Sequence, residues 1–138
     1  MKGCEFCKLL LEKENPFRIV DLNLSAVFLN KDQLFLGSVL IISKKHAEEL
    51  DELSQDERGT FIEDMVKVGT AIKKGFNPAK LNYALLGNIV PHLHWYIIPR
   101  YKNDPNWNNP PWPHQDKYLN EEQYRTLVEK IRRFLPFI

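Results

Sequence analysis

The chain is poor in cysteine, carries little net charge and contains no long apolar run. Only two of its 138 residues are cysteines, and 19 basic residues against 18 acidic ones leave a formal charge of +1. So few thiols exclude a disulfide-stapled fold, and the balanced charge argues against a protein that coats nucleic acid. No apolar run approaches the length that crosses a bilayer, and the first residues lack the pattern of a cleavable signal. We therefore expect a cytoplasmic protein without membrane or nucleic-acid partners.

Internal repeats are also missing, and the only compositionally biased stretch is a segment rich in Pro, Asn and Trp over residues 101–120. A chain of this length can bury a sufficient core as one unit, so we expect a single domain over residues 1–138. The biased segment has too much proline for regular structure. Trp107 and Trp112 could cover a base or pack on a partner subunit, and we expect packing. We expect His114 to be a solvated loop residue.

Apolar spacing and capping signals predict three helices, over residues 4–14, 54–75 and 121–135. Ser54 with Glu57 forms a capping box before the long second helix, which Gly75 is expected to help end, and Asn120 with Gln123 is expected to cap the last helix. The strongest β-favouring runs cover residues 17–20, 25–30, 38–43, 81–86 and 88–100. A Gly87-Asn88 link favours a tight hairpin between the last two strands. These elements predict an α+β fold, a mostly antiparallel sheet with helices packed on it.

The most informative stretch is the last predicted strand, which ends in the run from Pro91 to Arg100. Alternate residues of a strand point to opposite faces. Three polar rings therefore share one side, His92, His94 and Tyr96. Apolar residues occupy the other side, Leu93, Trp95 and Ile97. A strand anchored by its apolar side would hold the two imidazoles at fixed positions, which suits a functional site.

Residues 87–100 resemble the signature of the histidine-triad (HIT) superfamily of nucleotide hydrolases and transferases, His-x-His-x-His followed by apolar residues and Pro-Arg. Residues 37–46 are similar to the upstream strand of that family, which ends in a basic-basic-His turn. Residues 4–8 resemble the N-terminal Cys-x-x-Cys of its zinc-bearing members. The resemblance implies an α+β domain that forms a homodimer and takes a nucleotide as substrate.

The resemblance assigns catalysis to the three motif positions. His94, the middle one, is the predicted nucleophile, and His92 and Tyr96 occupy the outer two. A neutral imidazole can attack phosphorus near pH 7 if one nitrogen is tied by a hydrogen bond and the other is free. The expected reaction is cleavage at the α-phosphate of a dinucleoside polyphosphate or a nucleoside phosphoramidate through a nucleotidyl-histidine.

Nucleotide binding is assigned by the same resemblance to four further residues, Asn30, Asn82, Asn88 and Arg100. The family places amides near the phosphate and a polar side chain near the ribose, and donors around a phosphate stabilise the charge that develops during the reaction. Each of the three Asn residues has an alternative role as an ordinary turn or strand-end residue.

Two positions depart from the family pattern. Tyr96 replaces the third His, and Ser38 stands where relatives frequently carry His. A Tyr hydroxyl can donate a hydrogen bond to a phosphate, but its pKa near 10 makes it a poor proton donor and acceptor at neutral pH. The alternative function is therefore a nucleotide-binding protein with weak or lost catalysis.

The cysteine pair predicts a metal site. Cys4 and Cys7 have the spacing that grips one ion, and in a reducing compartment such a pair indicates a metal or redox site. The resemblance adds His46 and His92, which gives a Cys2His2 set for a structural zinc ion. The alternative is two buried thiols and a capping His. If zinc binds, His92 becomes a ligand and is lost to acid-base chemistry.

Overall fold

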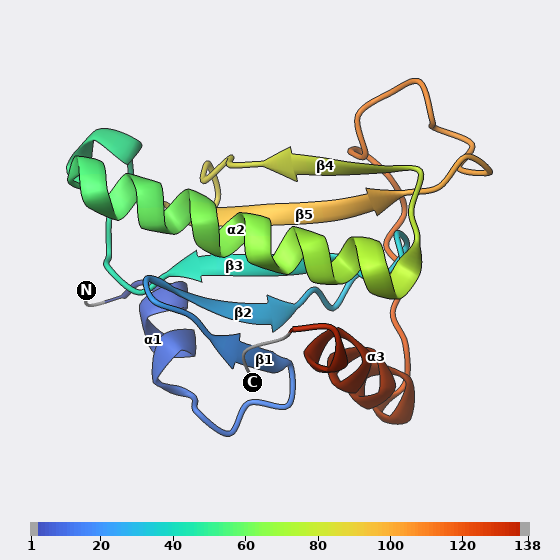
Figure 1. Cartoon of the computed structure of the whole chain (residues 1–138), viewed down its shortest axis with the longest axis horizontal. Coiled ribbons are helices and arrows are strands. Elements are labelled where there is room, and N and C mark those ends of the chain that lie inside the picture. Colours follow the sequence, from blue (N-terminus) through green and yellow to red (C-terminus); the bar gives the residue numbers. More distant parts are fainter. Residues whose placement is uncertain (1–2, 136–138) are drawn as a thin grey trace.

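A five-stranded antiparallel sheet forms the centre of the molecule (Figure 1). The structure is a computed structural model and describes residues 3–135. Its strands are β1 (Arg18–Asp21), β2 (Ser25–Leu29), β3 (Val39–Ser43), β4 (Lys80–Ala84) and β5 (His94–Arg100). They lie in the order β1-β2-β3-β5-β4, and every neighbouring pair is antiparallel. Together with three α-helices, this antiparallel sheet confirms the predicted α+β class.

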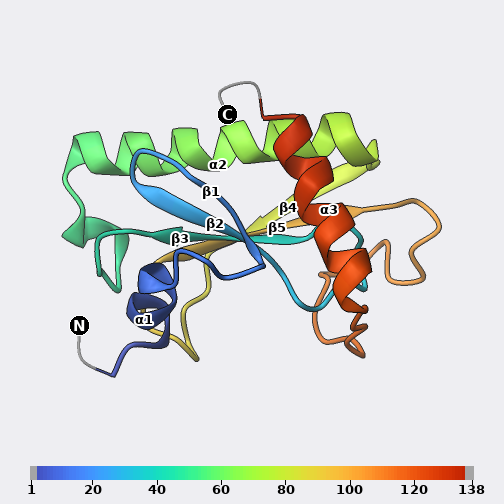
Figure 2. The ribbon, with the colours of Figure 1, turned by 90° about the horizontal axis from the view of Figure 1, so that it is seen from below.

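Three helices cover the two faces of the sheet, with α2 on one face and α1 on the other (Figure 2). Their bounds are α1 (Glu5–Leu11), α2 (Gln55–Phe76) and α3 (Glu121–Arg133), and a 3-10 turn, η1 (Leu50–Glu52), precedes α2. The predicted capping boxes are present at the starts of α2 and α3, where Ser54 and Asn120 accept from the third backbone N–H of each helix. The last helix ends at Arg133, two residues earlier than predicted.

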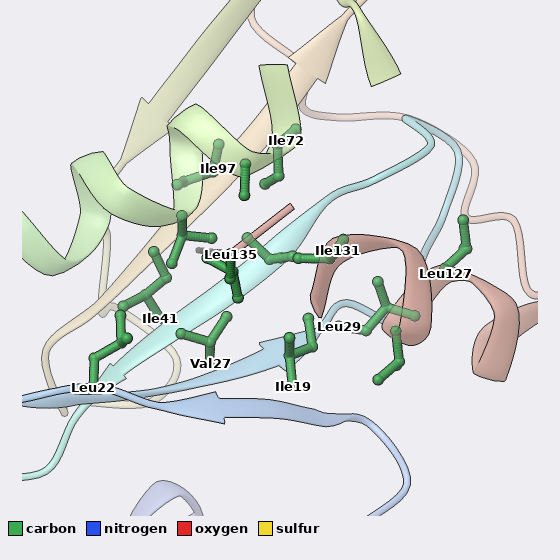
Figure 3. Packing of buried hydrophobic residues seen from close by; sticks show 14 of the residues in the cluster. Ile19, Leu22, Val27, Leu29, Ile41, Ile72, Ile97, Leu127, Ile131 and Leu135 are labelled. Atoms are coloured by element: carbon green, nitrogen blue, oxygen red, sulfur yellow. The ribbon is translucent and has the colours of Figure 1, made fainter. Parts of the chain in front are cut away.

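The main core lies between the sheet and the pair of helices α2 and α3 (Figure 3). Alternate side chains of β2, β3 and β5 face these helices, among them Val27, Ile41 and Ile97, which are fully buried. Ile72 of α2 and Ile131 of α3 meet them. Because this face of the sheet is filled, the opposite face of β5 is held in a fixed position for chemistry.

The end of α2 differs from the prediction. Gly75 lies inside the helix, and the left-handed cap is Asn77, with φ of 48°. Close packing explains the glycine instead, because a Cβ at position 75 would lie 3.1 Å from the ring of Phe134, which follows α3. Asn tolerates the left-handed conformation better than most residues, which explains why it can take the capping position.

The predicted tight hairpin at Gly87-Asn88 is wrong, although β4 and β5 do pair antiparallel. β4 ends at Ala84 and β5 begins at His94, so residues 85–93 form a longer connection. Leu93 leaves the ladder with β4 because its backbone bonds to the end of β3 and to the chain that follows. Its carbonyl accepts from Ser43 N, and its N–H donates to Ala47 O. His92 consequently precedes the strand instead of lying on it.

Between Arg100 and the start of α3, the described chain forms no helix or strand, as the proline content predicts. Among residues 3–135, no helix is both long and apolar enough to cross a bilayer.

Candidate active site and metal centre

His94 opens β5 and pairs with Ile42 of β3, so the middle of the sheet carries its backbone. Its neighbours Leu93 and Trp95 turn to the α2 side, where they pack with Phe61 and where Trp95 lies 5.5 Å from the Phe61 ring. The imidazole therefore projects to the other face, which also carries α1. This is the alternation that the sequence predicts for residues 93–97.

The imidazole of His94 is held in one tautomer. Its Nδ1 lies 2.6 Å from the carbonyl oxygen of His92, and because a carbonyl can only accept, Nδ1 carries the proton. Nε2 is left with a lone pair. Nε2 has no hydrogen-bond partner within the described residues, and it is not fully buried. The fully buried polar atoms without a partner there are Arg18 Nε, Ser25 Oγ, Asp64 Oδ1 and Trp95 Nε1. Nε2 is thus the one nitrogen of His94 that can reach a ligand.

The surroundings of His94 keep the ring neutral and oriented. The residue is 4% exposed, and the ring of Phe6 in α1 packs edge-on against it at 4.7 Å. Burial lowers the pKa of His94, and the hydrogen bond to the His92 carbonyl only partly opposes this. An unprotonated imidazole with a free Nε2 is the form that can act as a nucleophile.

Tyr96, at the third motif position, lies on the same face with its ring centroid 5.3 Å from that of His94. Burial raises the pKa of its hydroxyl, so the group is a hydrogen-bond donor at neutral pH. The hydroxyl makes no hydrogen bond within residues 3–135. It is therefore available to a bound molecule.

The four predicted metal ligands come together from three distant parts of the chain, and their ligand atoms all lie within 4.8 Å of one another. Nδ1 of His92 is 3.1 Å from Nδ1 of His46, 3.3 Å from Sγ of Cys4 and 3.6 Å from Sγ of Cys7. Tetrahedral zinc, with bonds of about 2.3 Å to sulfur and about 2.0 Å to nitrogen, sets its ligand atoms about 3.3–3.8 Å apart. The cluster can hold a metal ion with only small adjustments.

The chemistry of His92 also fits a metal. Its Nε2 lies 2.7 Å from the carbonyl oxygen of Ser43 and must carry the proton, which leaves Nδ1 as a lone pair aimed at the cluster. A ligand His whose other nitrogen donates to a carbonyl is the usual arrangement in metal sites. His92 therefore faces the thiols through its side chain, while its backbone carbonyl orients His94.

The structure does not place the four predicted nucleotide-binding residues at one point. Asn30, at the end of β2, donates through Nδ2 to Ser38 Oγ at 3.4 Å and accepts from the N–H of Asp32 at 3.2 Å. Asn88 is exposed in the connection before β5. These side chains are partly or fully open to solvent, and their roles stay predictions.

Asn82 and Arg100 lie together at the far end of the strand pair. Arg100 is six residues beyond His94 in β5, which is about 20 Å along a strand. Its guanidinium donates to Asn82 Oδ1, to Asp104 and to the carbonyls of Asn106 and Asn109, at 2.6–3.0 Å. In this structure Arg100 organises the start of the 101–120 segment, and its donors are engaged by the protein.

A search for a functional site by cavity size alone would have led to a region away from His94. A hollow of about 730 Å³ lies between β1 and α3, and none of the predicted site residues lines it. The hollow lies beyond the C-terminal end of α1, whereas the unpartnered nitrogen of His94 and the four candidate metal ligands lie near its N-terminal end. Their chemistry identifies this second place.

The sequence interpretation of His114 is wrong. Its side chain is only 5% exposed, and it donates from Nε2 to Asp32 Oδ2 and from Nδ1 to the carbonyl of Pro111, both at 2.6 Å. We call this contact the Asp32–His114 clasp. Asp32 lies 82 positions away in the sequence, so no local pattern could reveal it. The contacts of Phe6 with His94 and of Trp112 with Tyr96 could not be predicted for the same reason.

The clasp predicts a pH dependence. Burial lowers the pKa of His114, but the hydrogen bonds to Asp32 and Pro111 and the charges of Asp32 and Asp116 outweigh it, so the pKa is raised. Because the pKa of His114 is higher in the folded protein than in the unfolded chain, its protonation stabilises the fold. This stabilisation is complete below the unfolded pKa of 6.5 and is lost as the pH rises through the folded pKa.

We therefore expect the melting temperature to fall more steeply in the wild type than in His114→Asn as the pH rises above about 6.5, because an Asn side chain does not titrate. Loss of the charged hydrogen bond should cost about 1.5–3 kcal/mol. Thermal unfolding over this pH range measures it. Equal slopes for the two proteins would show that the clasp does not titrate.

Comparison with known proteins agrees with this arrangement. A model of the HIT domain matches residues 12–103. An uncharacterised HIT-like protein of Methanocaldococcus jannaschii is 36% identical over 107 residues, 73% of this chain and 81% of the relative. The adenosine 5'-monophosphoramidase of Schizosaccharomyces pombe is 30% identical over 130 residues, 94% and 96% of the two chains. The asymmetrical bis(5'-nucleosyl)-tetraphosphatase of the same organism is 34% identical over 86 residues, 59% of this chain and 47% of the relative.

Solved structures show the same fold. A histidine triad protein of Bradyrhizobium japonicum superposes with a TM-score of 0.77 at 30% identity, over 86% of this chain and 89% of the other. A zinc-bound histidine triad family protein of Mycobacterium smegmatis has a TM-score of 0.73 over 95% and 94% of the chains, and its 19% identity limits the likeness to the fold. Since the family model spans more than half of the chain, from before β1 to beyond β5, this protein belongs to the HIT family.

Proposed function

We propose that this protein is a nucleotide hydrolase or nucleotidyl transferase that cleaves at the α-phosphate of dinucleoside polyphosphates or nucleoside phosphoramidates. The observation that carries the proposal is the unpartnered Nε2 of His94, whose tautomer is fixed by the His92 carbonyl. Relatives named for phosphoramidase and tetraphosphatase activity support the reaction class and differ in the leaving group.

In the proposed first step, Nε2 of His94 attacks the α-phosphorus. A bond forms between nitrogen and phosphorus as the bond to the leaving group breaks, and the leaving group departs with the electron pair. In the second step water adds to phosphorus, the bond to His94 breaks, and a nucleoside monophosphate is released. Donors near the phosphate oxygens stabilise the charge of both transition states, and we assign this role to Tyr96 and, from the family pattern, to Asn88.

A second candidate is a nucleotide-binding protein with little turnover, which the Tyr at the third motif position favours. Incubation with diadenosine tetraphosphate and with adenosine 5'-phosphoramidate, followed by chromatography of the products, separates the two. Release of AMP from either compound supports the hydrolase. Tight nucleotide binding with no product from any nucleotide would support the second candidate.

We further infer that zinc occupies the cluster of Cys4, Cys7, His46 and His92. Four protein ligands would leave no open position, so the ion would be structural. It would tie the short helix α1 to the chain after β3 and to the connection before β5. α1 has no fully buried residue of its own, so such a tie would add much to its stability and would help hold Phe6 against His94.

We also propose a homodimer formed through α2 and the open edge of β4. β4 is an edge strand of the sheet. Beside it α2 exposes Ile62 and Val66, 44% and 46% exposed, and Tyr83 of β4 is 47% exposed. A Cβ at Gly69 of α2 would lie 3.5 Å from the Tyr83 hydroxyl, so the helix and the edge strand lie against each other beside these exposed apolar side chains.

Val66→Lys should convert the dimer into a monomer, because it puts a charge in the middle of this surface without a partner. Sedimentation velocity measures the change. Gln55→Lys, at the exposed start of the same helix, is the matched control and should leave the dimer intact. A wild-type protein that sediments as a monomer would rule the dimer out.

A further inference from the structure

The Tyr96 side chain packs against two aromatic rings. Its hydroxyl makes no hydrogen bond within the described residues, so no polar contact fixes the direction of the ring. Two aromatic contacts remain, His94 at 5.3 Å with an interplanar angle of 72° and Trp112 at 5.1 Å with an angle of 71°. Tyr96 is thus held between the proposed nucleophile and a residue of the 101–120 segment.

The chain on both sides of Trp112 is fixed by hydrogen bonds. The carbonyl of Pro111, directly before it, accepts from Nδ1 of His114, and Nε2 of His114 donates to Asp32, both at 2.6 Å. Asp32 Oδ1 also accepts from the N–H of Lys117 at 2.9 Å. At the start of the segment, Arg100 bonds to the carbonyls of Asn106 and Asn109. A segment without helix or strand therefore presents one indole at a defined place.

We propose that Trp112 is a positioning residue that fixes the Tyr96 hydroxyl beside His94, and that the Asp32–His114 clasp holds Trp112 for this purpose. The inference rests on the proposed function and extends it to the leaving group. A hydroxyl of such high pKa does not release its proton to water at neutral pH, but the nitrogen becomes strongly basic as the phosphorus–nitrogen bond breaks, and the Tyr96 hydroxyl then delivers its proton to it. The phenolate regains a proton from the water that cleaves the nucleotidyl-histidine, so the cycle closes without another reactant.

This role has a substrate signature. Without a proton the nitrogen would have to leave as an amide anion, which is far more basic than a phenolate, whereas a departing polyphosphate anion needs a proton much less. A misaligned Tyr96 should therefore slow the cleavage of adenosine 5'-phosphoramidate more than that of diadenosine tetraphosphate. A purely structural role of Trp112 would affect both substrates alike.

The test is a double-mutant cycle of Trp112→Leu and Tyr96→Phe in the full-length protein, with kcat and KM measured on both substrates. We expect Trp112→Leu to lower kcat for the phosphoramidate by about 3- to 100-fold with little change in KM, and to have no further effect in the Tyr96→Phe background. Trp112→Phe should restore most of the rate. Trp107→Leu, in the same segment, is the matched control and should be close to wild type.

Equal losses on both substrates, or the same loss with and without the Tyr96 hydroxyl, would overturn the inference. The cycle is also measured as the affinity for AMP, a readout that needs no turnover. If the wild type binds AMP but cleaves neither substrate, the proposed function fails, and the coupling of the two residues in AMP affinity still decides whether Trp112 positions Tyr96. Additive effects on that affinity would reject it.

Discussion

Replacing His94 by alanine is expected to abolish nucleotide cleavage, lowering kcat by about three orders of magnitude or more, while nucleotide affinity changes far less. The substitution removes the proposed nucleophile, and no other imidazole on the described chain is placed to replace it: His92 and His46 face the metal cluster and His114 is held by Asp32. Loss of a nucleophile typically removes most of the rate of the chemical step. Steady-state kinetics on both nucleotides, with calorimetric titration of AMP, measures the two effects.

Because His94 is nearly buried, the alanine variant also leaves a void beside Phe6. His94→Asn is the matched control for packing, since its amide can still donate to the His92 carbonyl but cannot attack phosphorus. Both variants should bind AMP and melt cooperatively without turning over. Cleavage by either variant at a rate near that of the wild type would contradict the assignment of the nucleophile.

Removal of the metal is expected to destabilise the protein more than any surface substitution. At free zinc about 1,000 times above the dissociation constant, binding contributes about 4 kcal/mol to folding. Cys7→Ser removes one ligand and should lower both the zinc content, expected at about one ion per chain, and the melting temperature. Elemental analysis and thermal unfolding, with and without a chelator, measure both quantities.

Leu11→Ser is the matched control for this experiment, because it lies in the same helix and is 79% exposed. It should keep the metal and the melting temperature. A wild-type protein that purifies without any metal, and that a chelator does not destabilise, would indicate that the four side chains form a hydrogen-bonded cluster of thiols and imidazoles instead.

Local patterns in the sequence predicted most of the framework. Capping boxes at Ser54 and Asn120 depend only on residues three positions apart, and both are present. The alternation predicted correctly that Leu93, Trp95 and Ile97 face the helix α2 and that His94 and Tyr96 face the other side of the sheet, because burial of one side fixes the other. The hairpin before His94 was predicted incorrectly, since the chain there bonds to residues after β3 that no local signal indicates.

Contacts between distant residues were beyond what the sequence alone could predict. The resemblance to the HIT family supplied the four metal-site residues, and the fold brings them together. The Asp32–His114 clasp and the contact of Trp112 with Tyr96 belong to a segment whose conformation depends on tertiary hydrogen bonds. Asn82 and Arg100 were grouped with His94 by family pattern, yet the strand carries them to its other end.

The central claim is that Nε2 of His94 forms a bond to the phosphorus of a nucleotide. Rapid quenching of the enzyme with adenosine 5'-phosphoramidate, followed by peptide mass spectrometry under conditions that preserve phosphorus–nitrogen bonds, tests it directly. We predict an adenylyl group on the peptide that contains His94, with the modification on that residue. An adduct on another residue, or AMP released during turnover with no adduct at any time point, would contradict the account.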